Sequence, residues 1–155
     1  MLAHANRMLW WFGWLKVPMI GYCRPRLTRL DASGVTMIIP LRRRTRNHLG
    51  SMYFGALAVG ADVAGGFLAF FLAEQRKLKM SLAFKAVSGE FFKRPERDVE
   101  FRCDDGPLIS TMLEQAQASG ERINQPVAIT ARCPAQFGDE AVARFELVLS
   151  IKVVG

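Results

Sequence analysis

An almost uninterrupted run of apolar residues from Met52 to Ala73 constrains the fold of this chain more than any other feature. As a helix, the run is long enough to cross a bilayer. Asp62 stands near its middle, however, where a charged side chain costs about 2.5–3.5 kcal/mol on membrane-insertion scales. A helix that is apolar on all sides is either a membrane span or the core of a domain. We therefore expect a buried core helix from about Met52 to Arg76, with Ser51 as its N-cap.

Strand patterns stand on both sides of this helix. The alternation of apolar and polar residues is clearest in the last strand, which ends near the C-terminus. Residues 32–34 are expected to join the first two strands as a hairpin, and Ser88-Gly89 is expected to bend the longest one. The expected strands are 26–31, 35–41, 78–93, 99–103, 127–133 and 144–153.

Two shorter helices complete the pattern. Residues 1–16 form one, rich in tryptophan, after which Pro18, Gly21 and Pro25 are expected to break regular structure. Residues 107–118 form the other, with proline at an early helical position and Gly120 as its stop.

A central helix that is apolar all round needs a cover, and a sheet needs something on which to bury its apolar face. These requirements predict an α+β domain of the hotdog type, in which a curved antiparallel sheet wraps one long central helix. The short N-terminal helix and the small inserted helix are additions to this core. We expect a single domain over residues 1–155, with a helical extension at 1–24 and the hotdog core at 25–155.

The charge and the cysteines narrow the possible partners. A formal charge of +7 favours anionic ones, such as nucleic acid, a membrane surface or a phosphate-bearing molecule like coenzyme A. Nucleic acid is not expected, because the basic run at residues 42–46 lacks the interleaved aromatics that stack on bases. Three cysteines without CxxC spacing predict neither a metal site nor a disulfide framework, and they fit a cytoplasmic protein. No cofactor is expected.

A motif lies at the entrance to the central helix. The chain reads Asn47-His-Leu-Gly-Ser-Met-Tyr53-Phe54-Gly55, with Asp62 nine positions after Tyr53. It resembles the thioesterase branch of the hotdog superfamily, whose members often carry Asn-x-x-Gly-x-x-His-Gly-Gly with an acidic residue nine positions after the His. Here tyrosine replaces that His and phenylalanine the first Gly of the pair. The resemblance is closest to the DUF4442 subgroup, and it extends by pattern order from about Pro25 to the C-terminus.

The resemblance implies hydrolysis of acyl-CoA or a related acyl thioester. Amides in the first turn of a helix lack intrahelical acceptors, so the N–H of Phe54 or Gly55 is expected to stabilise an oxyanion. Asp62 is the expected general base or nucleophile. Asn47 would orient the thioester or the water, and Tyr53 would contact the substrate. His48 lies outside the motif register and is expected to be an exposed loop residue.

A helix separates these groups within one chain. Nine residues turn a helix by about 900°, which leaves Tyr53 and Asp62 on opposite sides and roughly 13 Å apart along the axis. The family solves this with a dimer in which the carboxylate of one chain faces the helix entrance of the other. A homodimer or homotetramer is therefore expected.

Structural alternatives remain open for each residue. Asp62 could be a buried polar anchor, because a charge in an apolar helix needs compensation. Asn47 could be a turn residue. The basic residues Arg42, Arg43, Arg44 and Arg46 could be a solvated loop or a clamp for the phosphates of coenzyme A.

The N-terminal helix admits several roles as well. It could pack on the sheet or cover an acyl tunnel, which we expect, or lie at a membrane interface. Two other functions therefore stand beside a thioesterase: a non-catalytic acyl- or lipid-binding hotdog protein, and a peripheral membrane partner.

Overall fold

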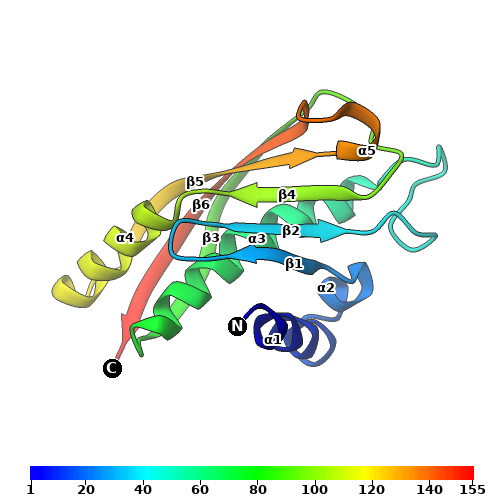
Figure 1. The fold of residues 1–155 in the computed structure, drawn as a ribbon. Coiled ribbons are helices and arrows are strands. Elements are labelled where there is room, and N and C mark those ends of the chain that lie inside the picture. The colour runs from blue at the N-terminus through cyan, green and yellow to red at the C-terminus, as the bar shows by residue number, and fades with distance from the viewer.

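Six antiparallel strands form one curved sheet around the long helix α3, Phe54–Gln75 (Figure 1). The computed structural model describes residues 1–155, and the order of strands in the sheet is β1-β2-β4-β5-β6-β3. The strands are β1 (Arg26–Leu30), β2 (Val35–Ile39), β3 (Lys79–Phe91), β4 (Val99–Cys103), β5 (Ile123–Arg132) and β6 (Ala141–Val154). The other helices are α1 (Leu2–Leu15), α2 (Pro18–Cys23), α4 (Gly106–Ser119) and α5 (Pro134–Phe137). This is the predicted hotdog fold.

The sheet buries α3 against its concave face. Twelve of the 22 residues of α3 are buried, and the most apolar 18-residue window of this helix is 61% buried inside the protein. By length and composition α3 would also suit a membrane span, but its neighbours are strands of the same chain. The ring of Phe101 in β4 lies so close to Gly60 that no Cβ would fit between them. The predicted core helix is therefore confirmed.

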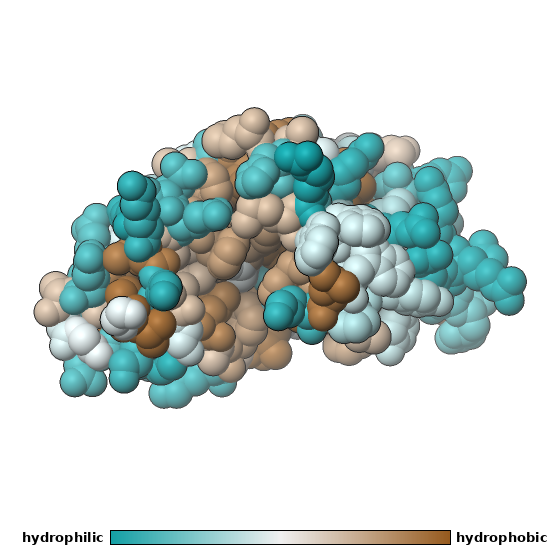
Figure 2. Space-filling view, turned by 90° about the horizontal axis from the view of Figure 1, so that it is seen from below, coloured by the Kyte–Doolittle hydropathy of each residue, from teal (hydrophilic) through white to brown (hydrophobic).

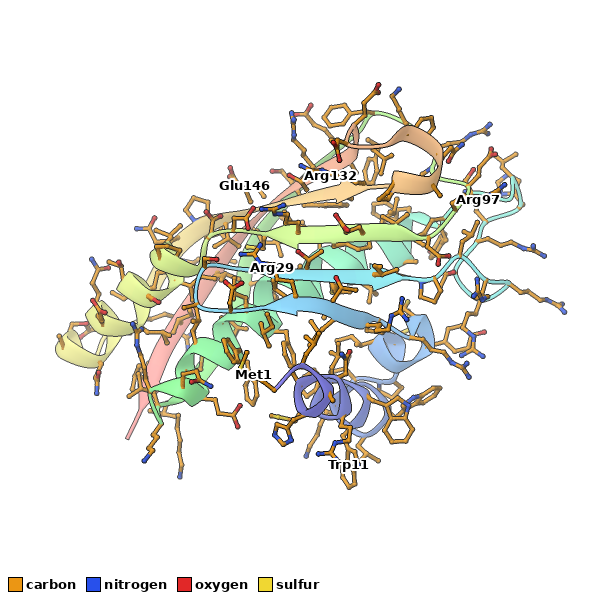
Figure 3. The ribbon with its side chains drawn as sticks, in the orientation of Figure 1. Met1, Trp11, Arg29, Arg97, Arg132 and Glu146 are labelled. Atoms are coloured by element: carbon orange, nitrogen blue, oxygen red, sulfur yellow. The ribbon has the colours of Figure 1, made fainter.

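The strand pairings follow the alternation in the sequence. β1 and β2 form the predicted hairpin, and β6 pairs with β5 on one side and β3 on the other. The apolar residues of β6 face α3, while Arg144 and Glu146 point outward; Figure 3 shows Glu146 on the outer side of the sheet. β3 is the last strand of the sheet, so one of its edges has no partner within the chain.

Three local predictions were wrong, and one short helix was not predicted. Residues 18–23 form α2, because Pro18 occupies the first turn of a helix and Arg24 ends it in the left-handed region. The N-cap of α3 is Tyr53, and the Ser51 hydroxyl is buried without a hydrogen-bond partner. The irregularity in β3 lies between Phe84 and Ala86 instead of at Ser88-Gly89. The short helix α5 was not predicted from the sequence.

Candidate functional site

The side chain of Asp62 lines an apolar groove that runs between α1, α3 and β3. The groove has a volume of about 1080 Å³. Its walls come from Met8, Phe12 and Leu15 on α1, from Val63, Phe67 and Phe70 on α3, and from Met80, Leu82 and Phe84 on β3. Three cationic or imidazole side chains, His4, Arg7 and Lys16, also line it from α1. Asp62 is the only carboxylate among the lining residues, so the groove is an apolar space with one acidic group.

The carboxylate of Asp62 has no partner within the chain. It makes neither a hydrogen bond nor an ion pair, and burial alone raises its pKa above the usual value. A carboxylate that served as a structural anchor would be bonded to a backbone amide or an arginine. An unpaired carboxylate beside an open groove is instead available to a ligand or to water.

The start of α3 presents unpaired amides. The N–H groups of Phe54, Gly55 and Ala56 have no acceptor in the chain, and no side chain caps the helix. Together with the helix dipole they favour a negative charge at this end. The ring of Tyr53 lies against Gly55, leaving no space for a Cβ there.

Phe54 is exposed and packs edge-on against Phe91 of β3, with 5.7 Å between ring centroids. The phenyl ring therefore joins the start of α3 to the free edge of the sheet.

Asn47 organises the loop that leads into α3. Its Oδ1 accepts hydrogen bonds from the N–H groups of Leu49 at 2.9 Å and of Ser51 at 3.1 Å. Its backbone N–H donates to the carbonyl of Ser51 at 2.7 Å. The side-chain oxygen is thus occupied by the loop, as the structural alternative predicts, and only its Nδ2 remains without a protein partner. His48 is exposed in the same loop.

Within one chain, Asp62 and the unpaired amides do not meet. The groove beside Asp62 is lined by none of the residues 53–55. The unpaired amides of residues 54–56 lie six to eight residues before Asp62 on one rigid helix, which separates the two groups by about 9–12 Å along the helix axis. One chain alone therefore does not bring the two groups together in one cavity.

The basic residues of the loop form a separate cleft. Arg42, Arg43 and Arg44 line it together with Arg24 and Tyr22, and its volume is about 640 Å³. Arg46 is not among its lining residues, whereas Arg24 and Tyr22 were not predicted to belong to it. The Tyr53 N–H donates to the Thr45 carbonyl at 2.7 Å, so the loop is fastened to the start of α3.

The wall that β3 contributes to the groove was the part of the site that sequence reasoning missed. The alternation of Met80, Leu82 and Phe84 in β3 was the available signal, since one face of that strand is apolar. Helix α1 forms the opposite wall, in agreement with the expectation that the N-terminal helix covers the core or a tunnel.

Residues 5–133 match the sequence family described as a domain of unknown function, DUF4442. The chain belongs to the DUF4442 family. This match confirms the DUF4442 subgroup, which the motif at the start of α3 resembles most closely. No curated protein matches the sequence significantly.

Solved structures share the whole fold of this family member at low sequence identity. A protein of unknown function from Pseudomonas aeruginosa, described as a probable thioesterase, is 19% identical with a TM-score of 0.78, and 96% of each chain is covered. A protein of unknown function from Chlorobaculum tepidum is 11% identical with a TM-score of 0.84, over 97% of this chain and 96% of its own. A thioesterase from Haemophilus influenzae is 12% identical with a TM-score of 0.71, over 99% of this chain and 91% of its own. At these identities the similarity establishes the hotdog fold.

Proposed function

We propose that the protein is a thioesterase that hydrolyses acyl-CoA or a related acyl thioester at the interface of a homodimer. The observation that carries the proposal is the unpaired carboxylate of Asp62 in an apolar groove. Two hotdog structures similar to this chain are described as thioesterases, one of them as a probable one, which supports the same class of reaction.

The proposed reaction uses one group from each subunit. Asp62 accepts a proton from water, and the water oxygen attacks the carbonyl carbon of the thioester. The oxyanion that develops is stabilised by the unpaired N–H of Phe54 or Gly55 from the partner subunit. The carbon–sulfur bond then breaks, the thiolate leaves with the proton held by Asp62, and a carboxylic acid remains. In the nucleophilic variant Asp62 attacks the carbonyl carbon directly, the carbon–sulfur bond breaks and releases the thiolate, and water then hydrolyses the resulting anhydride to regenerate Asp62 and free the carboxylic acid.

The free edge of β3 supports the dimer. This strand is 13 residues long, and Phe84, Val87 and Phe91 are exposed on it. A long apolar edge strand is normally paired, covered or interrupted by charges, because it otherwise attracts other strands. Pairing of two such edges in a symmetric dimer covers both of them. Phe54 contacts Phe91 on this strand, so the same dimer brings the start of α3 close to the second subunit.

The two cavities suit the two ends of an acyl-CoA. The groove offers an apolar wall to an acyl chain that reaches Asp62. The cleft formed by Arg24, Arg42, Arg43 and Arg44 offers guanidinium groups to phosphates, for which their planar geometry is well matched. Acyl-CoA is therefore the substrate to test first, with acyl carrier protein as the alternative carrier.

Hydrolysis of a panel of acyl-CoAs of increasing chain length tests the proposal. The free thiol is detected with a disulfide reagent, and Asp62→Asn is compared with Glu146→Gln, which changes an exposed carboxylate on the outer face of the sheet. We expect turnover by the native protein and by Glu146→Gln, and a loss of about 10²–10⁴-fold in Asp62→Asn. Turnover that survives unchanged in Asp62→Asn would remove Asp62 from the mechanism.

A second function, non-catalytic binding of acyl groups, is favoured by one observation. The Tyr53 ring lies on Gly55, and the Phe54 ring beside it is exposed. Thioesterases that carry the full motif have His and Gly in place of Tyr53 and Phe54. Binding of acyl-CoA without turnover, measured by calorimetry, would select this function. In that case the groove would bind the acyl group without catalysing its hydrolysis.

A further inference from the structure

Helix α1 turns its large aromatic residues outward. Its buried residues are Ala5, Leu9 and Gly13. Seven large apolar or aromatic residues on α1 and α2 each expose between 37% and 65% of their surface. One is Phe12 in the wall of the groove, and the other six are Trp10, Trp11, Trp14, Leu15, Met19 and Tyr22. We call these six residues the aromatic patch. An ordinary surface helix has the opposite arrangement, with its large apolar side chains in the core.

The aromatic patch lies on the underside of the molecule. Figure 3 shows Trp11 pointing away from the sheet, below α1. Figure 2 looks onto this underside, where brown and pale residues occupy the middle and hydrophilic, teal ones lie at both ends. A contiguous exposed face of this kind is the signature of a surface that meets an apolar partner.

The patch is held rigidly in place. The Asn6 side chain pairs with both backbone groups of Leu27 in β1, its Oδ1 accepting from the N–H at 2.8 Å and its Nδ2 donating to the carbonyl at 3.0 Å. Helices α1 and α2 cross at Gly13 and Gly21, where a Cβ on Gly13 would come within 2.8 Å of the Gly21 nitrogen. The outward direction of the tryptophans is therefore fixed by packing on the opposite side of α1.

Positive charge surrounds the patch. The first 30 residues contain five Lys or Arg and no Asp or Glu, and Arg7, Lys16 and Arg24 are exposed beside the aromatic side chains. Arg44 stacks on Tyr22 with its guanidinium carbon 4.9 Å from the ring centroid. That contact joins the patch to the arginine-lined cleft, so apolar rings and cations form one surface.

We infer that the aromatic patch is a docking surface for an anionic lipid bilayer. Tryptophan and tyrosine prefer the boundary between headgroups and acyl chains, because their rings are apolar and their N–H or O–H remains in contact with water. Cationic side chains next to them are attracted to the negative surface of such a membrane. α1 then lies in the plane of the interface, as interfacial amphipathic helices do.

A second copy of this chain is a poorer occupant of the patch. A symmetric dimer through this face would bring the same patch from both subunits together. Arg7, Lys16 and Arg24 would then face their own copies, and no carboxylate from the first 30 residues would pair with them. The inference does not require the proposed thioesterase activity, because it uses neither Asp62 nor the start of α3, although Trp11 and Leu15 of the patch also line the groove beside Asp62.

Vesicle binding tests the inference with a built-in reporter. All three tryptophans of the protein belong to α1, so intrinsic emission reports on this helix alone. Native protein is mixed with phosphatidylcholine vesicles, either pure or containing one third phosphatidylglycerol, and both emission and co-sedimentation are measured. We expect a blue shift and sedimentation with the anionic vesicles, and both effects to weaken with added salt.

Two variants localise the binding. Trp10→Ser/Trp11→Ser keeps Trp14 as reporter and is expected to partition at least about tenfold more weakly. Phe92→Ser removes an exposed aromatic residue remote in sequence from α1 and is expected to bind like the native protein. Equal binding to pure phosphatidylcholine, unchanged binding by the double tryptophan variant, or no binding at all would overturn the inference. It would also be overturned by self-association in solution that the double variant abolishes.

Discussion

The carboxylate of Asp62 lies beside Gly66, one turn further along α3. Its Oδ1 is 3.8 Å from the position that a Cβ on residue 66 would take, and the Cζ of Phe84 is 3.4 Å from the same position. Both are ordinary contact distances, so this part of the groove has space for one methyl group. The space beside Gly60, six residues earlier in α3, is tighter, because the ring of Phe101 occupies it.

Two alanine substitutions on α3 are therefore expected to have opposite effects. Gly66→Ala should stabilise the fold by about 0.5–1 kcal/mol, because alanine loses less backbone entropy in a helix than glycine. Gly60→Ala should destabilise it by about 1–3 kcal/mol, since its Cβ collides with a buried ring. Urea unfolding followed by circular dichroism measures both. Equal effects of the two changes would show that the Phe101 ring does not limit the space for a side chain at position 60.

Asp62→Asn is expected to stabilise the protein at neutral and higher pH. Burial raises the pKa of Asp62 in the folded state, whereas an aspartate in the unfolded chain titrates near about 3.9. Below that pH both states are protonated and the carboxyl contributes nothing. As the pH rises, the folded state must ionise a group in apolar surroundings, so the native protein loses stability relative to the variant.

Unfolding free energies at about pH 8 and about pH 3.5 test this sign, with the largest gain for Asp62→Asn at the higher value. Glu146→Gln serves as the control and should change little at either pH, because its carboxylate is exposed. A variant that is less stable than the native protein at the higher pH would mean that the carboxylate has a stabilising partner.

Phe54→Pro should remove one candidate oxyanion donor while preserving the helix. Proline is favoured in the first turn of a helix, and the Tyr53 backbone (φ −62°, ψ 139°) already has the extended conformation that a residue before proline requires. We expect kcat to fall by about 10²–10³-fold relative to Phe54→Ala, which keeps the N–H and removes the ring. If the two variants have the same kcat, the Phe54 amide is not the donor and Gly55 is the remaining candidate.

The three cysteine thiols should be inert in the folded protein. All three are buried, and burial raises the pKa of the Cys103 thiol to about 11 and those of Cys23 and Cys133 above the ordinary value. Because the thiolate is the reactive form, alkylation at neutral pH should be slow in the native state and complete in urea. Mass spectrometry after timed iodoacetamide treatment measures it. Rapid labelling of Cys103 in the folded protein would contradict its burial.

The sequence predicted the parts of the fold that depend on strong periodicity. The apolar run around Asp62, the alternation in β6 and the proline and glycine that bound α4 each indicate one element by local physics alone. The same information could not assign the faces of α1. Its orientation depends on Asn6 bonding to Leu27 and on a close crossing at Gly13, which are tertiary contacts. Trp10 and Trp14, which were expected to cover the core or a tunnel, are consequently exposed and do not line the groove, whereas Trp11 is exposed and lines it.

The sequence predicted which chemical groups belong to the candidate site, but not how the fold arranges them. Asp62 and the first-turn amides followed from a charge in an apolar helix and from the unpaired donors of any helix start. The role of Asn47 as a loop organiser was one of two alternatives that its sequence position left open. Which arginines share a cleft could not be predicted, because Arg24 lies far from Arg42 in the sequence and the fold brings them together.

Mixed dimers test the central claim, that Asp62 of one subunit acts with the α3 amides of the other. Asp62→Asn and Phe54→Pro protomers, each expected to be inactive alone, are unfolded together in equal amounts and refolded. Random pairing makes half of the dimers mixed, and each mixed dimer holds one intact site, so about one quarter of native activity should return. Mixed dimers that form, as shown by two affinity tags, yet remain inactive would contradict a site shared between subunits.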